Sequence, residues 1–218
     1  MAWSHPVFRL PMKKYLVEFI GTFFLVFTVG STVIAPGAGG LAPIAIGASL
    51  MVMVFAGGHI SGGHYNPAVT LAVFLRGRCD RADVIPYWIA QIAAAFVAAW
   101  LIHFTKFGAS PQPSPIAWKA ALLVEFLFTF ALCWVVLNTA TSKGTAGNSF
   151  YGLAIGMTVM VGAFAVGGIS GGAFNPAVAT GISLMGLSFW SNFWVLVVGE
   201  LLGAVAAATA FKVVTGGE

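Results

Sequence analysis

Six apolar stretches along the chain are candidates for membrane-spanning helices. They are separated by turns rich in glycine, proline and polar residues, and they lie at about residues 15–34, 43–55, 84–104, 118–138, 150–164 and 189–214. A helix needs ~20 apolar residues to cross a bilayer. The second and fifth stretches run directly into glycine-rich loops, so the pattern predicts six spans with an irregular segment after two of them.

Two near-identical segments follow the second and fifth stretches. They read Ile-Ser-Gly-Gly-His-Tyr-Asn-Pro-Ala-Val at 60–69 and Ile-Ser-Gly-Gly-Ala-Phe-Asn-Pro-Ala-Val at 169–178, and eight of the ten positions match. The two Asn-Pro-Ala triplets are 109 residues apart (175 − 66). A match of this length indicates an internal duplication.

Each copy predicts a short helix that starts at its Asn-Pro-Ala triplet. Asn is a favoured N-cap, and Pro is tolerated at the first helical position because its missing N–H would be unpaired there. Apolar residues then continue only to Leu75 in the first copy and to about Leu187 in the second. This is roughly half the length of a full span. We therefore expect two half-helices, each preceded by an extended glycine loop.

The repeat extends beyond these segments. Glu18 in the first span corresponds to Glu125 in the fourth, and Gln91 in the third corresponds to Glu200 in the sixth. Because each copy holds three spans, an odd number, the second copy must be inverted relative to the first. We expect one transmembrane domain over residues 1–218, built from inverted repeats at about 12–108 and 116–215. The half-helices then enter from opposite faces and meet near the midplane.

The composition supports a multi-pass membrane protein. Of the 218 residues, 59% are hydrophobic and 7% are charged, and the mean hydropathy is +0.95. A net charge of +4 is too small to indicate nucleic-acid binding. The apolar run at 15–34 is too long for a signal peptide and has no cleavage site after it, so it is the first span.

The positions of Lys and Arg predict the orientation. With the N-terminus inside, two of the ten lie outside, Lys106 and Lys119. The inside segments hold the other eight: Arg9, Lys13, Lys14, Arg76, Arg78, Arg81, Lys143 and Lys212. Positive charge is enriched in cytoplasmic loops, so both termini are expected in the cytoplasm. The short termini and loops suggest a prokaryotic inner membrane.

The sequence indicates no metal site and no cofactor. Cys79 and Cys133 are far apart and form neither a disulfide framework nor a metal-binding spacing. His59 and His64 flank the first Ser-Gly-Gly without a neighbouring thiol or carboxylate. Structural hydrogen bonding is therefore the favoured interpretation of both histidines.

The paired motifs resemble the signature of the aquaporin and glycerol-channel family, the major intrinsic proteins. The resemblance covers nearly the whole chain and implies an all-α membrane protein in which six transmembrane helices and two half-helices form an inverted 3+3 repeat. It also implies a passive channel for water and small uncharged solutes, with no enzymatic activity, assembled as a homotetramer in membrane lipid.

The resemblance assigns roles to particular residues. The motif residues at the centre of the pore are Asn66, Pro67, Ala68, Asn175, Pro176 and Ala177. Carbonyl groups along the pore come from Gly62, Gly63, His64, Gly171, Gly172 and Ala173. Glu18 and Glu125 accept hydrogen bonds from the two loops, with a proton relay as the alternative. Facing helix N-termini repel cations, and the Asn amides donate to passing oxygens, which orients water and excludes ions and protons.

The expected selectivity filter departs from the family pattern. Val178 stands where the family usually has Arg, and the other three filter positions fall at Ile46, Ala163 and Gly172. The Asp typical of glycerol channels after the second triplet is missing too. This predicts a wide, apolar filter that passes water, with larger neutral solutes such as urea, ammonia, glycerol or metalloid hydroxides as the alternative main cargo. Glu200 replaces a common Pro and receives no role.

Three other functions remain as alternatives. An inverted-repeat secondary transporter would need a coupling site among the buried glutamates and would show saturable, ion-dependent flux. A membrane enzyme would need a catalytic constellation, and none is apparent in the sequence. A purely adhesive membrane protein would show no flux at all.

Overall fold

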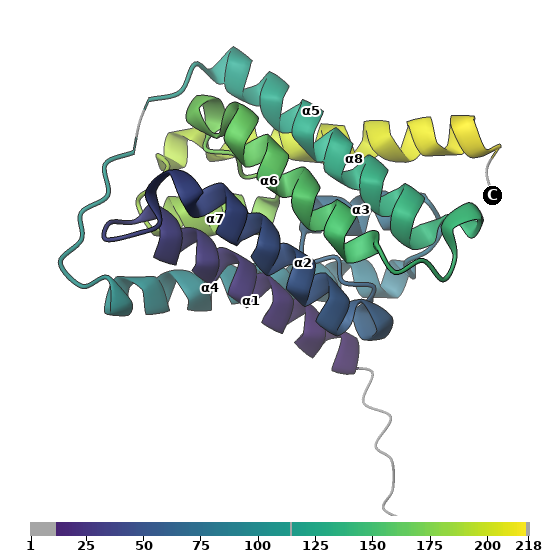
Figure 1. Ribbon diagram of the computed structural model, residues 1–218. Coiled ribbons are helices and arrows are strands. Elements are labelled where there is room, and N and C mark those ends of the chain that lie inside the picture. Colours follow the sequence, from purple (N-terminus) through teal and green to yellow (C-terminus); the bar gives the residue numbers. More distant parts are fainter. Residues whose placement is uncertain (1–11, 114, 217–218) are drawn as a thin grey trace, which may run out of the picture.

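The structure is a computed structural model that describes residues 12–113 and 115–216, and over these ranges its regular secondary structure is entirely helical. The two short helices are α3 (Pro67–Leu75) and α7 (Pro176–Leu184). The six long helices are α1 (Lys13–Val33), α2 (Ala42–Ser61), α4 (Arg81–Thr105), α5 (Trp118–Val136), α6 (Tyr151–Ser170) and α8 (Phe193–Thr215) (Figure 1). The other helical segments of the described chain are short: three 3₁₀-helices at Gly39–Leu41, Lys143–Thr145 and Trp190–Asn192, and a π-helix at Leu137–Thr141.

Six helices of the described chain, taken with their adjoining turns, are long and apolar enough to cross a membrane. They confirm the six predicted spans. Arg9 of the orientation argument and Ser114 of the connector between the repeats lie outside the described residues.

Two predicted boundaries were wrong by several residues. The helices α2 and α6 continue past Phe55 and Phe164 through paired glycines to Ser61 and Ser170. Close packing requires one of these glycines, since a Cβ on Gly57 would lie 2.1 Å from the hydroxyl oxygen of Tyr65, whereas a Cβ on Gly167 or Gly168 would meet nothing within 4 Å.

The second half-helix also ends earlier than predicted, at Leu184 instead of about Leu187. Gly186 has a φ of 74°, and the N–H of Leu187 turns back to the carbonyl of Ile182 at 2.8 Å. This is the usual hydrogen bond that closes a helix C-terminus after a left-handed residue. The apolar side chain of Leu187 thus belongs to the closing turn.

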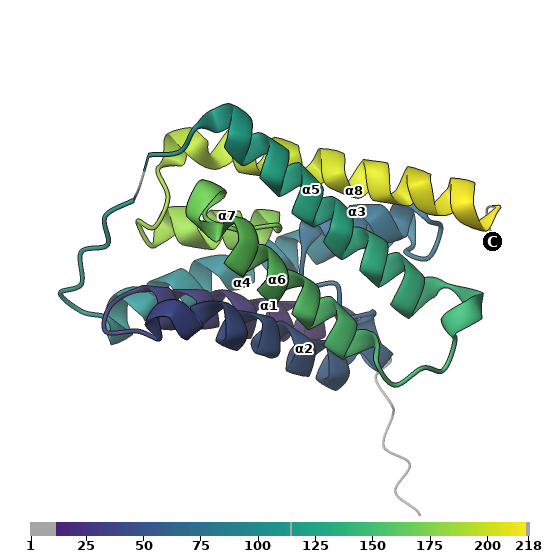
Figure 2. The ribbon, with the colours of Figure 1, turned by 45° about the horizontal axis from the view of Figure 1, so that its top comes forward.

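The packing repeats between the two halves of the chain. In the first half α1 packs on α2 and α4, and in the second half α5 packs on α6 and α8. The half-helices are exchanged, because α3 packs on α8 and α7 packs on α4. Figure 2 shows α3 and α7 between the two groups of long helices. This reciprocal arrangement is what an inverted repeat requires.

The two halves meet where α2 crosses α6. A Cβ on Gly47 would lie 2.7 Å from the carbonyl oxygen of Gly156, and a Cβ on Gly156 would lie 2.4 Å from that of Gly47. Only glycine allows backbones to approach this closely, as is common between membrane helices. The small residues therefore fix the distance between the halves.

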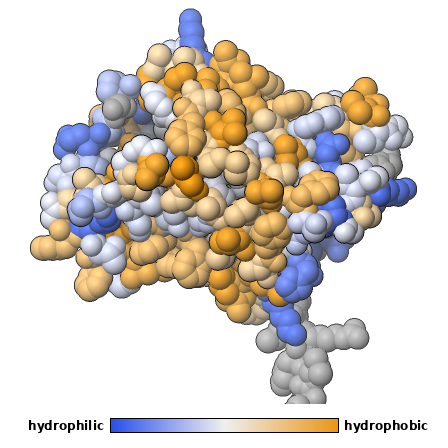
Figure 3. Space-filling model, in the orientation of Figure 1, coloured by the Kyte–Doolittle hydropathy of each residue, from blue (hydrophilic) through white to orange (hydrophobic). Residues whose placement is uncertain are grey.

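The outer surface is largely apolar. Large hydrophobic side chains on the outside of the long helices are half-exposed or more, among them Phe96, Trp100, Leu123, Val161 and Leu202. Hydrophobic residues predominate across the middle of the face in Figure 3, and hydrophilic residues gather toward its left and right ends. Such a distribution suits a protein surrounded by lipid along its middle and by water at both ends.

Candidate functional site

Two irregular loops lie inside the helix bundle, one between α2 and α3 and one between α6 and α7. Each begins with two glycines in the left-handed region, Gly62 and Gly63 with φ of 89° and 63°, and Gly171 and Gly172 with φ of 100° and 65°. Irregular backbone at membrane depth occurs only where it is buried in protein or lines a water-filled cavity. Both loops are therefore candidates for the wall of a pathway through the membrane.

Each loop also holds an aromatic residue in an unfavourable backbone conformation. Tyr65 has a φ of 50° and Phe174 a φ of 49°, and both side chains are almost completely buried. A non-glycine residue adopts this conformation only when its surroundings hold it there. The same strain at equivalent positions shows that the two loops share one backbone shape.

Glu18 of α1 holds the first loop. Its carboxylate accepts hydrogen bonds from the hydroxyl of Ser61 at 2.7 Å and from the backbone N–H groups of His64 and Tyr65 at 2.9 and 2.6 Å. The side-chain amide of Gln91 donates a fourth, at 2.9 Å. A buried carboxylate that accepts this many hydrogen bonds is a fixed part of the structure, which favours the scaffold interpretation over a proton relay.

Glu125 of α5 holds the second loop in the same way. Its carboxylate accepts from the hydroxyl of Ser170 at 2.6 Å and from the N–H groups of Ala173 and Phe174 at 3.0 and 2.7 Å. Donors of the same kind at equivalent positions explain why the loops match in shape. Both predicted loop-supporting glutamates thus contact the loops they were assigned to.

The two motif asparagines cap the half-helices and tie the loops together. The side-chain oxygen of Asn66 accepts from the N–H of Ala68 at 2.8 Å, and that of Asn175 accepts from the N–H of Ala177 at 2.9 Å. The side-chain nitrogen of Asn66 donates to the carbonyl of Phe174 at 2.8 Å, and that of Asn175 donates to the carbonyl of Tyr65 at 2.9 Å. Because a side-chain amide has two N–H bonds, each Asn keeps one for another acceptor.

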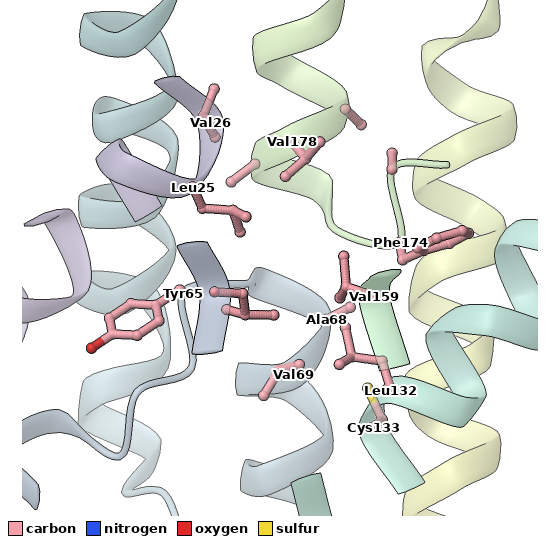
Figure 4. Close-up of a cluster of buried hydrophobic side chains, with 14 of the residues drawn as sticks. Leu25, Val26, Tyr65, Ala68, Val69, Leu132, Cys133, Val159, Phe174 and Val178 are labelled. Carbon is pink, nitrogen blue, oxygen red and sulfur yellow. The ribbon is translucent and has the colours of Figure 1, made fainter. Parts of the chain in front are cut away.

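A cavity of about 260 Å³ runs past the two asparagines. Asn66 and Asn175 both line it, and its lining includes no Asp, Glu, Lys or Arg of the described chain. Most of the wall is aliphatic. In Figure 4 the side chains of Leu25, Val159 and Val178, which come from α1, α6 and α7, approach the same region. The cavity is thus a narrow, largely aliphatic passage whose wall includes the two motif asparagines.

All four predicted filter residues line this cavity: Ile46, Ala163, Gly172 and Val178. Of the predicted carbonyl residues, those that line it are His64, Gly171, Gly172 and Ala173. Gly62 lines the neighbouring cavity, and Gly63 lines neither. The remaining motif residues, Pro67, Ala68, Pro176 and Ala177, are buried at the starts of the half-helices.

A wider cavity of about 870 Å³ adjoins the narrow one. His64 and Val136 line both, so the two cavities meet there. The wider one is lined by charged residues that include Lys14, Arg78 and Asp83. Together the cavities form a polar vestibule that leads into an apolar passage.

The vestibule is lined by two residues that the sequence analysis considered as metal ligands, Cys79 and His64. Cys79 lines it, and burial raises the pKa of its thiol to about 11, so the thiol stays protonated at neutral pH. The ring of His64 pairs with the hydroxyl of Thr70 at 3.1 Å, which is the structural hydrogen bond expected of it. No cluster of three His, Cys, Asp or Glu that could hold a metal occurs in the described part of the chain.

Three residues near the loops escaped the sequence interpretation. Glu200 accepts a hydrogen bond from the N–H of Asn175 at 3.0 Å. The hydroxyl of Tyr87 donates to the carbonyl of Ser61 at 2.7 Å, and the indole N–H of Trp88 donates to the carbonyl of Pro67 at 3.1 Å. The correspondence of Glu200 with Gln91 in the repeat could have indicated the role of Glu200. No such correspondence marks Tyr87 or Trp88.

Comparison with known proteins decides the family. The sequence model of the major intrinsic protein family matches residues 4–211. The chain belongs to the major intrinsic protein family. This confirms the resemblance that the paired motifs indicated, and the members of this family are passive channels for water and small neutral solutes.

Relatives in the major intrinsic protein family come from plants and bacteria. Aquaporin NIP1-3 of Oryza sativa subsp. japonica is 37% identical over 97% of this chain and 77% of its own. Glycerol uptake facilitator protein-like 6 of Lactiplantibacillus plantarum is 39% identical over 93% of this chain and 98% of its own. The X-ray structure of the aquaglyceroporin from Plasmodium falciparum superposes with a TM-score of 0.77 at 21% identity, covering 93% of this chain and 96% of that one. The fold is therefore that of an aquaporin-type channel.

Proposed function

We propose that this member of the major intrinsic protein family is a passive channel whose narrow cavity admits water together with larger uncharged solutes. The observation that carries the proposal is the lining of the narrow cavity: Ile46, Ala163, Gly172 and Val178 share it with the two asparagines, and the lining contains no Asp, Glu, Lys or Arg of the described residues. The names of the relatives, an aquaporin and a glycerol uptake facilitator, agree with both classes of cargo.

Ion exclusion follows from the two half-helices. Each N-terminus carries roughly half a positive elementary charge, and both Asn66 and Asn175 face the narrow cavity from these ends. A cation would meet this positive potential without a negative group to replace its water shell. The spare N–H of each Asn donates to the oxygen of a passing molecule, so water at this point is oriented and cannot relay a proton.

Solute size is set by the side chains around Val178. Valine is shorter than the usual Arg and has no N–H donors, while Ala163 and Gly172 add little volume. Without a guanidinium the passage gains width and loses a fixed positive charge. We expect urea, ammonia, glycerol and uncharged metalloid hydroxides to pass together with water.

Stopped-flow light scattering on proteoliposomes tests the proposal. A sucrose gradient measures water permeability, and urea and glycerol gradients on the same vesicles measure solute-driven reswelling. Val178→Arg should suppress reswelling more than water flow, and Val178→Ile, which adds one methylene without charge or donors, is the matched control. Solute flux that is absent from the native protein, or unchanged in Val178→Arg, would refute the wide filter.

The flux should be linear in the solute gradient. The carboxylates that a secondary transporter would need for coupling are committed to the loops: Glu18 and Glu125 each accept several hydrogen bonds from them. Saturation of the flux at low millimolar solute, or its dependence on an ion gradient, would favour the transporter instead.

Orientation and assembly belong to the same proposal. Lys14, Arg78 and Lys143 line the vestibule, so we place the vestibule and both termini on the cytoplasmic side of the cell's inner membrane. The exposed apolar faces of the long helices contact lipid and neighbouring subunits of a homotetramer. Protease protection of tagged termini tests the orientation, and native mass spectrometry in detergent tests the assembly.

A further inference from the structure

The second half of the channel contains an additional buried carboxyl group. Glu200 of α8 is completely buried, and its Oε1 accepts the N–H of Asn175 at 3.0 Å. Its Oε2 is buried without a hydrogen-bond partner among the described residues. Among the described residues, the charged group whose field acts on Glu200 is Glu125, another carboxyl group. A charge held there without a partner would be costly.

The carboxyl groups of Glu200 and Glu125 accept hydrogen bonds from consecutive backbone N–H groups. Glu125 accepts the N–H of Phe174 and Glu200 accepts the N–H of Asn175, the next residue in the chain. Consecutive residues are only ~3.8 Å apart between Cα atoms, so the two acceptors are within reach of one another. The backbones of α5 and α8 are also close here, since a Cβ on Gly199 would lie 3.0 Å from the Cβ of Glu125.

The first half shows what this position does in the fold. Gln91 corresponds to Glu200, and its side-chain amide donates to Glu18 at 2.9 Å and to Thr70 at 3.1 Å. The loop-supporting Glu18 therefore has a donor on the third helix of its repeat, at the position that Glu200 occupies in the second repeat. Gln91 supplies N–H donors, whereas Glu200 supplies a donor only when it carries a proton.

We propose that Glu200 and Glu125 share one proton, and that the resulting carboxylic acid–carboxylate hydrogen bond positions the second pore loop as the Gln91–Glu18 hydrogen bond positions the first. Two ionised carboxylates that accept from consecutive N–H groups would repel each other, and one shared proton removes that repulsion. Glu200 is thus a positioning residue: it acts on Asn175 and, through Glu125, on the loop.

A substitution between the halves fits this assignment. Thr70, which receives the second hydrogen bond of Gln91, corresponds to Ala179 in the second half. A protonated carboxyl has one O–H and can satisfy a single acceptor, whereas the amide of Gln91 has two N–H bonds. The second half therefore lacks the second acceptor, for which the single O–H of a carboxylic acid would leave no donor.

Infrared spectroscopy of the purified channel in lipid tests for the proton directly. At neutral pH the native protein should show the C=O stretch of a buried carboxylic acid, and Glu200→Gln should lose it. Gln91→Glu places the same carboxyl pair in the first half and should add a second band. No acid band in the native protein, or a band of unchanged intensity in Glu200→Gln, would overturn the proposal whatever solutes the channel conducts.

Permeability measurements separate the effect of the proton on flux from the effect of the side chain's shape. Glu200→Gln keeps an acceptor for Asn175 and gains donors for Glu125, so water flux should match that of the native protein. Glu200→Leu removes acceptor and donor alike, and its flux per folded channel should fall several-fold. If the proton is removed at strongly alkaline pH, native flux should fall while that of Glu200→Gln stays constant; equal pH profiles in the two proteins would contradict the shared proton.

Discussion

The two pore loops have the same backbone and different surroundings. Both are held by a glutamate that accepts a serine hydroxyl and two backbone N–H groups. The first loop adds His64, which lines both cavities, whereas the second has Ala173 at the equivalent position. The comparison teaches that the anchors fix the shape of the passage, while the side chains facing it are free to differ and so set what passes.

The largest effect is expected from removing an anchor. Glu18→Ala leaves four donors of the first half unpaired; Glu125→Ala leaves three donors of the second half and, with the shared proton, the O–H of Glu200. Each buried unpaired donor costs ~1–3 kcal/mol, so both variants should lose several kcal/mol of stability. Thermal unfolding in one detergent measures the difference, at roughly 2–4 °C per kcal/mol. The mutation Leu16→Ala, at a lipid-facing position of α1, is the control; equal midpoints for all three would break the comparison.

The next largest effect is expected on solute flux, from side chains that line the passage. Val178→Arg in the first turn of α7 should lower urea and glycerol flux about tenfold or more, which corresponds to ~1.4 kcal/mol of added barrier. His64→Ala on the first loop widens the junction with the vestibule and should leave the ratio of solute to water flux unchanged. Stopped-flow measurements on both variants decide whether selectivity lies at Val178; a changed ratio only in His64→Ala would place it in the first loop.

A smaller effect is expected at the caps of the half-helices. Asn66→Ala and Asn175→Ala each lose an N-cap, worth ~1 kcal/mol, and the hydrogen bond to the opposite loop. Because each amide also orients water in the passage, both variants should leak protons. A pH-sensitive dye inside proteoliposomes measures the leak; vesicles that stay as tight as the native ones would remove the asparagines from the proton barrier.

The smallest effect should come from the vestibule. Lys14 forms an ion pair with Asp83 at 2.5 Å, and the equivalent positions of the second half hold Ala121 and Asn192. Partly exposed ion pairs contribute ~0–1 kcal/mol, so Lys14→Met should shift the unfolding midpoint by only a few degrees. Lys119→Met, at the far end of the molecule, serves as control. A shift as large as that of Glu18→Ala would show that the vestibule also holds the first loop.

Repetition explains how much of this molecule could be predicted. The apolar stretches predicted the six spans. The duplicated motif predicted both half-helices, the caps at Asn66 and Asn175 and the matching glutamates, because each of these assignments was supported twice. The family resemblance placed Ile46 and Ala163, which no local pattern marks, and both line the narrow cavity.

The remaining features depend on packing that the sequence does not display. The glycine pair after Phe55 resembled a helix end, but the helix continues through it, and the hydroxyl of Tyr65 packs where a side chain on Gly57 would lie. Gly63 was assigned to the pore, and it faces neither cavity. Glu200 had no role because its partner, the N–H of Asn175, becomes available only when α8 packs beside the second loop.

The crossed hydrogen bonds of the two asparagines also bear on how such a chain could arise. Asn66 donates to a carbonyl of the second loop and Asn175 to the equivalent carbonyl of the first, which is the reciprocity of a symmetric two-fold interface. A single half, paired with an inverted copy of itself, would satisfy both bonds without any change. Gene fusion would then have preserved an existing dimer contact, and afterwards each half could acquire side chains of its own.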